Sequence, residues 1–189
     1  MLDDRAAVEQ ARLGDERAWR RLYECHSDLI FRLAMRTVGD REAALDIVQE
    51  TYLKAVRSLD GYRGDASFRS WLASIALNEA RSWVRRKLRK REVPIESITE
   101  PAQAGAPADV VVARAELAER ALGFIRTLPD QQRDAVLLRT TEGIAYREIA
   151  EALGTSEGSV RVSYHHGMAK LRDFMKNILE YRHEAAQDV

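Results

Sequence analysis

Apolar side chains recur every three or four residues along almost the whole 189-residue chain, and no segment shows the strict alternation of a β-strand. Because an α-helix turns once in about 3.6 residues, this spacing collects apolar side chains on one face of each helix. The pattern therefore predicts an all-α protein. We expect helices near residues 4–13, 15–37, 40–57, 67–90, 110–126, 130–141, 146–153 and 156–178.

One segment interrupts the helical pattern. Residues 91–109, REVPIESITEPAQAGAPAD, contain three of the four prolines and few large apolar side chains. Such a segment has too little apolar surface to pack, so we interpret residues 92–110 as a flexible linker. The linker separates two small helical domains, at 1–91 and 111–178, and a tail at 179–189 follows the second domain.

The formal net charge is zero, but the charges are segregated along the sequence. Residues 61–91 contain nine basic and two acidic side chains, whereas residues 92–120 contain two basic and six acidic ones. A polyanion responds to the local field, because salt screens exposed charges beyond about 8 Å at physiological ionic strength. The neutral total is thus compatible with nucleic-acid binding through residues 61–91, and it leaves acidic surfaces for another partner.

The composition is typical of a soluble, helix-rich protein. The chain is 46% hydrophobic and 32% charged, and its apolar runs are too short to span a bilayer. The first residues, MLDDRAAVEQARLGDE, lack the basic and then apolar order of a secretion signal. Cys25 is the single cysteine, so it cannot form an intrachain disulfide and suits a reducing compartment. We expect a cytoplasmic protein.

Residues 146–166, YREIAEALGTSEGSVRVSYHH, predict two helices joined by a sharp turn. Gly154 can adopt the left-handed conformation that ends the first helix, and Thr155 or Ser156 can cap the second. The outward side chains of the second helix are Arg161, Val162, His165, His166 and Ala169. Such a face suits the major groove of DNA, although a helical hairpin with a solvated face has the same pattern.

Residues 67–91, SFRSWLASIALNEARSWVRRKLRKR, predict one long helix with two faces. The apolar face holds Leu72, Ile75, Ala76, Ala80, Trp83 and Val84, and the polar face holds Ser74, Asn78, Arg81, Arg85 and Arg89. A column of guanidinium groups with an amide favours nucleic-acid binding. A solvated helix or a helix on a membrane surface is the alternative, but Trp71 and Trp83 favour packing into a domain.

Two further segments carry candidate binding residues. The loop at 59–68, LDGYRGDASF, presents Tyr62, Arg63, Asp65 and Ser67, which together could hold an unstacked base. The helix at 44–55, ALDIVQETYLKA, places Asp46, Gln49 and Glu50 on one side. The other side holds mainly Ala44, Ile47, Val48 and Tyr52. The carboxylates of the first side would repel phosphate, so that face should meet a basic protein surface unless it is merely solvated.

The titratable side chains give no sign of a catalytic or metal site. His165 and His166 are adjacent and point about 100° apart on a helix, so they cannot chelate one metal as an i, i+4 pair would. Cys25 and His26 are neighbours, but a lone cysteine among helices is more often a small buried hydrophobe than a nucleophile. We expect no catalytic residue, no metal and no cofactor.

The order of these segments resembles that of the bacterial extracytoplasmic-function sigma factors of the sigma-70 family, from about residue 13 to 176. DIVQETY is similar to the family helix that docks on the clamp coiled coil of the largest RNA polymerase subunit. YRGDASFRSWLASIALNEARSWVRR resembles the segment that captures and melts the −10 promoter element. Residues 128–172 resemble the domain that reads the −35 element. The resemblance implies a transcription initiation factor and not an enzyme.

The resemblance also implies roles for individual residues. The polymerase-docking positions are Asp46, Gln49, Glu50 and Tyr52. The −10 positions are Tyr62, Arg63, Gly64, Asp65, Ser67, Asn78, Arg81 and Arg85. The −35 positions are Ser159, Arg161, Val162, His165 and His166. Many relatives have more arginines on this last face, so we expect fewer phosphate contacts and a smaller dependence of binding on salt.

The implied partners are core RNA polymerase, promoter DNA and an anti-sigma factor, through which the protein could be held at a membrane without entering it. A stand-alone helix-turn-helix repressor or activator is the alternative. That class accounts for residues 128–172 but leaves the acidic helix and the −10 segment without a role. It predicts specific DNA binding by the isolated protein, whereas a sigma factor needs core polymerase.

Overall fold

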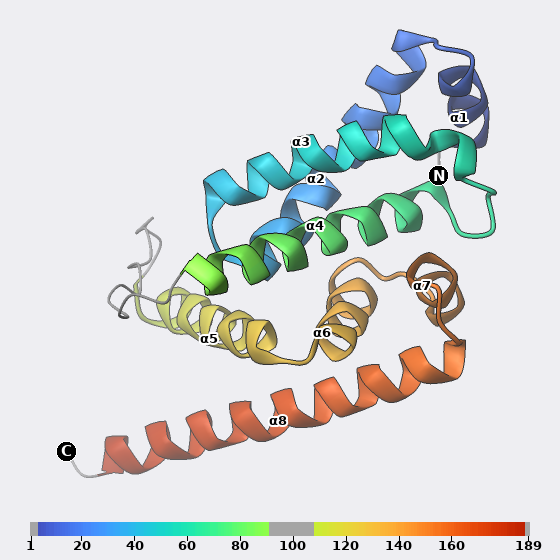
Figure 1. The fold of residues 1–189 in the computed structure, drawn as a ribbon. Coiled ribbons are helices and arrows are strands. Elements are labelled where there is room, and N and C mark those ends of the chain that lie inside the picture. The colour runs from blue at the N-terminus through green and yellow to red at the C-terminus, as the bar shows by residue number, and fades with distance from the viewer. Residues whose placement is uncertain (1–3, 91–107, 188–189) are drawn as a thin grey trace.

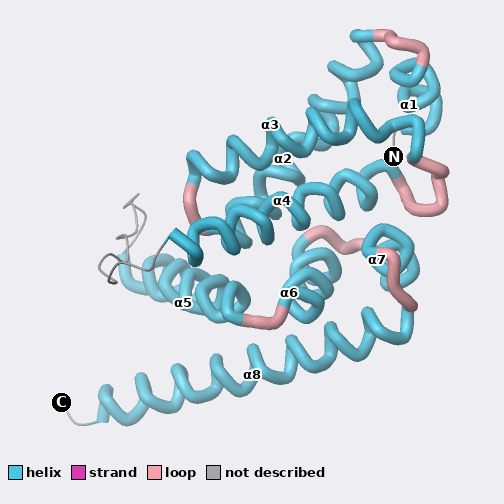
Figure 2. The backbone as a smooth tube through the Cα atoms, in the orientation of Figure 1, coloured by secondary structure: helices cyan, strands magenta, loops and turns pink. Residues whose placement is uncertain are grey.

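The computed structural model describes residues 4–90 and 108–187, and side-chain environments within 4–89 and 114–180. Every regular element in these ranges is a helix (Figures 1 and 2). The prediction of an all-α protein is therefore confirmed. Most of the predicted linker, residues 92–110, lies outside the described residues.

The first four α-helices form what we call the N-terminal region. They are α1 (Asp4–Arg12), α2 (Glu16–Val38), α3 (Arg41–Ser58) and α4 (Phe68–Lys90), with a short 3₁₀ turn, η1 (Leu59–Gly61), after α3. Local chemistry sets the sharp α2–α3 corner. Gly39 ends α2 in the left-handed conformation (φ +70°), and the Asp40 carboxylate accepts a hydrogen bond from the Ala43 amide to start α3.

The remaining helices form the C-terminal region. They are α5 (Ala108–Thr127), α6 (Asp130–Val136), a wider π-type turn η2 (Leu137–Thr141), α7 (Tyr146–Leu153) and α8 (Glu157–Gln187). Residues 179–187, which we expected to be a tail, continue α8. Gly167 allows α8 to lie close to α6, because a Cβ there would stand 2.7 Å from Val136 Cγ2.

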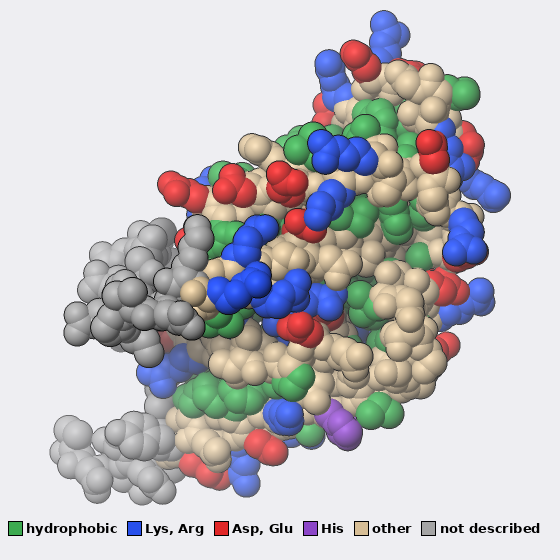
Figure 3. All heavy atoms as spheres, viewed as in Figure 1, with side chains coloured by type: hydrophobic (Ala, Val, Ile, Leu, Met, Phe, Trp, Pro, Cys, Tyr) green, Lys and Arg blue, Asp and Glu red, His purple; other side chains and the backbone are tan. Residues whose placement is uncertain are grey.

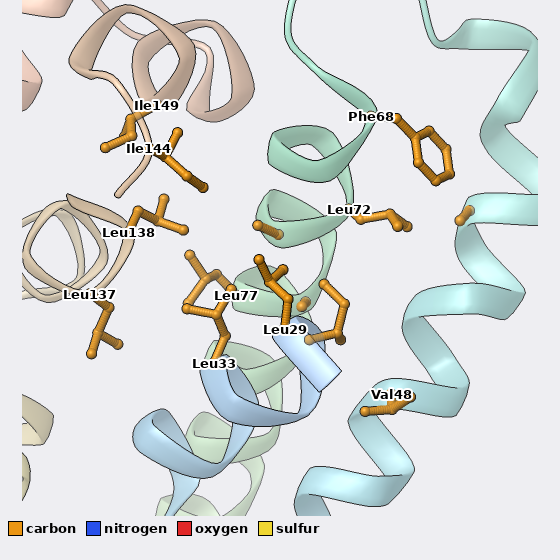
Figure 4. Close-up of a cluster of buried hydrophobic side chains, with 14 of the residues drawn as sticks. Leu29, Leu33, Val48, Phe68, Leu72, Leu77, Leu137, Leu138, Ile144 and Ile149 are labelled. Carbon is orange, nitrogen blue, oxygen red and sulfur yellow. The ribbon is translucent and has the colours of Figure 1, made fainter. Parts of the chain in front are cut away.

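The two regions pack directly against each other. Figure 1 shows α5, α6 and α7 lying between the α2–α4 group and α8. One cluster of buried side chains runs through both regions, and Figure 4 shows Leu33 and Leu77 of the N-terminal region on the side that faces Leu138 and Ile144 of the C-terminal region. All four are at most 2% exposed. The core is therefore continuous across the boundary between the regions.

Candidate functional surfaces

The acidic face of α3 is exposed as the sequence pattern predicts. Ala44, Ile47 and Val48 pack inward, while Asp46, Gln49 and Glu50 face solvent. Figure 3 shows acidic side chains gathered along this helix. The face is therefore free to meet a partner in this conformation.

Tyr52, which the resemblance assigns to polymerase docking, lies with Ala44, Ile47 and Val48 on the buried side of α3, as helical spacing predicts. Its side chain is buried, and its hydroxyl donates to the carbonyl oxygens of Leu22 and Tyr23 at 3.5 and 3.4 Å. Burial raises its pKa, with a further contribution from Tyr23. Tyr52 thus positions α3 against α2, and its ring is not part of the exposed face.

Three exposed apolar side chains beside the acidic ones escaped our reading of the sequence. Leu45, Leu53 and Val56 are 44–54% exposed on α3. At 100° per residue, Leu45, Val56, Gln49 and Leu53 occupy neighbouring directions around the helix. The signal was available in their spacing of eight and three residues. The α3 face is therefore partly apolar, which is typical of a protein-binding surface.

The loop between η1 and α4 holds Tyr62 firmly and leaves the next side chains free. The Tyr62 ring packs on Phe68 and Trp71, with ring centroids 5.8 and 5.0 Å away, and its hydroxyl donates to the Ala66 carbonyl at 2.7 Å. Burial raises the pKa of Tyr62. The Arg12 guanidinium donates to the Tyr62 carbonyl and so ties the loop to α1.

The other predicted loop residues are Arg63, Gly64, Asp65 and Ser67, and all four are exposed. Gly64 has a φ of +81°, which only glycine adopts at little cost. The Ser67 hydroxyl accepts a hydrogen bond from the Ser70 amide at 3.2 Å, so this side chain starts α4. The loop therefore presents the packed Tyr62 ring next to exposed polar side chains. An unstacked nucleotide can stack on such a ring and form hydrogen bonds with the polar groups.

The predicted polar row of α4 is split between solvent and the interior. Asn78 and Arg85 are exposed, and further basic side chains near the end of α4 form a cluster that is visible in Figure 3. Ser74 is buried and donates to the Trp71 carbonyl. Arg81 is half-buried, and its Nη2 lies 3.2 Å from Oδ2 of Asp134 in the C-terminal region. One predicted DNA contact is thus engaged within the protein.

The helix-turn-helix is built as the sequence predicts. Gly154 ends α7 with a φ of +64°, and the Ser156 hydroxyl accepts a hydrogen bond from the Ser159 amide at the start of α8. Val160 of α8 is buried in the core. The outward side chains of α8 are Arg161, Val162, His165 and His166, which are exposed, and Ser159, which is half-buried.

Arg161 is held by its own neighbours rather than projecting freely. Its guanidinium donates to the Glu157 carboxylate at 2.5 and 3.0 Å and stands 4.7 Å from the centre of the Tyr146 ring. These contacts orient the side chain on the exposed side of the helix. The exposed side of α8 therefore presents the oriented Arg161 guanidinium, followed about one turn later by the imidazoles of His165 and His166.

A cavity of about 170 Å³ separates the α4 row from the helix-turn-helix. Its lining includes Asn78 and Arg81 from α4, Asp134 from α6, and Thr155 and Ser159 from the turn and α8. Burial raises the pKa of the Asp134 carboxyl to about 6, against the attraction of the Arg81 and Arg133 guanidinium groups. Residues assigned to two different DNA elements therefore line one small space.

The described residues contain no group of three or more His, Cys, Asp or Glu side chains arranged to hold a metal ion. Within the same ranges, no helix combines the length and the apolar character that crossing a bilayer requires. The exposed surfaces described above remain the candidate sites.

Two family models match the chain. Sigma-70 region 2 matches residues 22–90, and sigma-70 region 4 matches residues 118–171. These ranges contain α3, α4 and the helix-turn-helix, so the candidate surfaces lie within the matched segments.

Two sigma factors of other bacteria are similar to most of this chain. The chain is 33% identical over 168 residues to the RNA polymerase sigma-H factor of Pseudomonas aeruginosa, covering 84% of this chain and 86% of the relative. It is also 33% identical to the ECF RNA polymerase sigma factor SigE of Mycolicibacterium smegmatis, covering 86% of this chain and spanning 64% of that protein's length.

Among solved structures, the fold is similar to CnrH in complex with the cytosolic domain of CnrY. The TM-score is 0.68 at 27% identity, and the match covers 92% of this chain and 97% of the other. Regions 2 and 4 thus occur in this order along the chain, in a fold similar to that of CnrH. The chain belongs to the extracytoplasmic-function group of the sigma-70 family of RNA polymerase sigma factors.

Proposed function

We propose that this protein directs core RNA polymerase to promoters by holding the −35 element with its C-terminal region and melting the −10 element with its N-terminal region. The observation that carries this proposal is that a surface suited to a protein partner and surfaces suited to nucleic acid lie on different helices. An acidic and apolar face lies on α3, whereas a basic row and a helix-turn-helix lie on α4 and α8. A protein partner and a nucleic acid can therefore bind at the same time.

Docking on polymerase would use Asp46, Gln49 and Glu50, with Leu45 and Leu53 beside them. The exposed carboxylates offer ion pairs to a basic helical partner, and the exposed leucines offer apolar surface whose burial adds affinity. Tyr52 holds α3 in place from behind. The clamp coiled coil of the largest polymerase subunit is the partner that family membership suggests for this face.

Capture of the −10 element would begin at the loop after η1. An unpaired base can stack beside the Tyr62 and Trp71 rings while Arg63, Asp65 and Ser67 offer hydrogen bonds to its edge. Asn78, Arg81 and Arg85 would then follow the strand along α4. A stacked base typically adds about 1–3 kcal/mol of binding free energy, which offsets part of the cost of unpairing DNA.

Recognition of the −35 element would place the first turns of α8 in the major groove. Arg161 can donate to a base edge or a phosphate, and Val162 can contact a thymine methyl group. The exposed imidazoles of His165 and His166 offer further hydrogen-bonding groups on the same part of α8. The sigma factor RpoE from Bartonella quintana is solved in complex with the anti-sigma factor NepR, and we extend control by an anti-sigma protein, with a cytoplasmic location, to this chain.

Run-off transcription tests the proposal. Core RNA polymerase and fragmented genomic DNA are incubated with and without the protein, and transcript starts are sequenced. New starts that share two spaced upstream motifs are expected. Tight, specific DNA binding by the protein alone, with no new starts, would instead support the stand-alone regulator.

A pair of variants locates the docking surface. Asp46→Arg reverses one charge on the α3 face and should lower transcription by reducing affinity for core polymerase, measured by co-elution. Glu119→Arg makes the same change on the exposed side of α5 and serves as the matched control. Equal activity of the two variants would argue against docking through α3.

A further inference from the structure

A buried carboxylate of the C-terminal region forms ion pairs with the N-terminal region at the boundary between them. Glu142, just after η2, has a side chain that is 2% exposed, and three arginines of the N-terminal region surround it. Arg36 approaches its carboxylate at 2.8 Å, Arg32 at 3.1 Å and Arg69 at 3.5 Å. Arg69 also donates to the Glu142 backbone carbonyl at 2.9 Å. We call these four residues the Glu142 clasp.

The clasp joins segments that are distant in sequence, because Glu142 lies 106 residues from Arg36 and 73 from Arg69. Within the C-terminal region, the contact made by the carboxylate is a 3.3 Å hydrogen bond from the neighbouring Thr141 hydroxyl. All three opposite charges come from the other region, so these ion pairs join the two regions. Removal of the Glu142 charge would leave three guanidinium groups close together without their shared partner, which is costly.

Two further polar contacts cross the boundary. The Arg126 guanidinium of α5 donates to the carbonyl oxygens of Arg36 and Met35 at 2.9 and 3.4 Å, in the last turn of α2. Gly39 leaves room for this guanidinium, since a Cβ at that position would stand 2.9 Å from Arg126 Cζ. Arg81, on the other side of the boundary, pairs with Asp134.

The packed arrangement cannot be the promoter-bound one. The −10 and −35 elements are about 25 base pairs apart, or about 85 Å along B-form DNA. Yet Arg81, assigned to the −10 element, lies 3.2 Å from Asp134, and Asn78 shares one cavity with Ser159 of the helix-turn-helix. The two regions must therefore separate before one molecule can hold both elements.

We propose that the Glu142 clasp and the Arg126 contacts hold the free protein in a closed, self-inhibited state, in which the C-terminal region occupies Arg81 and the adjoining part of α4 in place of −10 DNA. This inference rests on the proposed function for the identity of the nucleic acid. Asp134 takes the place that a phosphate would take beside Arg81. Separation also exposes Leu33, Leu77 and Leu138, so a partner that covers apolar surface favours opening.

Two variants that change the net charge in opposite directions test the closed state. A change in net charge alone cannot explain a result that both variants share. Glu142→Gln removes a negative charge from the clasp, and Arg126→Gln removes a positive charge from the α5 contact. Both should open the full-length protein. Glu180→Gln and Lys176→Gln change an exposed pair within α8 and are the matched controls.

Opening is measured by small-angle X-ray scattering, and exposure of α4 by fluorescence anisotropy with a labelled pool of random single-stranded 20-mers. We expect both test variants to show a larger radius of gyration and at least a severalfold tighter affinity for the oligonucleotides, with the controls unchanged. The gain should be lost when Arg81→Ala is added to either variant, because Arg81 is the side chain that opening releases.

Two results would overturn the proposal. One is a radius of gyration equal to that of the original protein in both variants. The other is opening without tighter DNA binding, which would mean that closure does not inhibit. Run-off transcription separates these results from failure of the proposed function. If the variants open and bind DNA more tightly but the protein yields no new transcript starts, only the promoter role is refuted.

Discussion

Replacing Asp134 by Asn tests the electrostatics of the region boundary through its dependence on pH. The carboxyl is 2% exposed, and Arg81 of α4 and Arg133 and Asp130 of α6 act on it. Burial raises its pKa from 3.8 to about 6, because removal of water disfavours the ionised form more than the two guanidinium groups favour it.

The sign of the effect follows from proton binding. Between pH 3.8 and about 6 the folded protein binds more protons at Asp134 than the unfolded chain does. The contribution of Asp134 to the free energy of unfolding therefore falls as the pH rises through this window, by about 2 kcal/mol between about pH 4.5 and 7. Asparagine has no such titration, so the stability of Asp134→Asn relative to the original protein should rise by the same amount.

Urea denaturation followed by far-ultraviolet circular dichroism at about pH 4.5, 5.5 and 7 measures this difference. Other titrating groups cancel when variant and original protein are compared at each pH. Asp28→Asn, which removes an exposed carboxylate from α2, is the control for loss of one charge. A stability difference that stays constant with pH, or falls as the pH rises, would refute the assignment of the raised pKa to the Asp134 carboxyl.

Three further changes have expected outcomes. Phe68→Ala empties a site that is 2% exposed beside Tyr62 and Trp71, and should lower the free energy of unfolding by about 3–5 kcal/mol in urea titrations; a loss below about 1 kcal/mol would contradict the packing. Gly154→Ala places a side chain at a φ of +64° and should cost about 1–2 kcal/mol, seen as a lower Tm, whereas an unchanged Tm would mean that the turn can relax. Arg161→Ala should weaken binding of the polymerase holoenzyme to promoter duplex and reduce the slope of log affinity against log salt by about 1 if it contacts phosphate; an unchanged slope would assign it to a base edge.

Helix positions were largely predictable because local forces decide them. The α2–α3 corner follows from Gly39 and Asp40, and the turn of the helix-turn-helix follows from Gly154 and Ser156, all of which act on neighbouring backbone groups. The exposed face of α8 and the acidic face of α3 follow equally from helical spacing. The functional roles assigned to these faces stay predictions.

The packing of one region on the other was not predictable, because it depends on contacts between residues 53–110 positions apart. Glu142 and Arg126 look like ordinary surface charges in the sequence. One signal was nevertheless present in α4. Leu77 and Ala73 lie outside the apolar stripe that we assigned, yet both are fully buried, so α4 is apolar over more of its circumference than one packing partner requires.

The continuous core has a consequence for synthesis of the chain. The α4 side chain Leu77 is made about 60 residues before Leu137 and Leu138, which at 5–20 residues per second corresponds to about 3–12 s. During this interval the N-terminal region can fold on the ribosome with one apolar flank uncovered. The nascent protein therefore passes through a stage in which the surface later hidden by its own second half is open to chaperones or to a waiting partner.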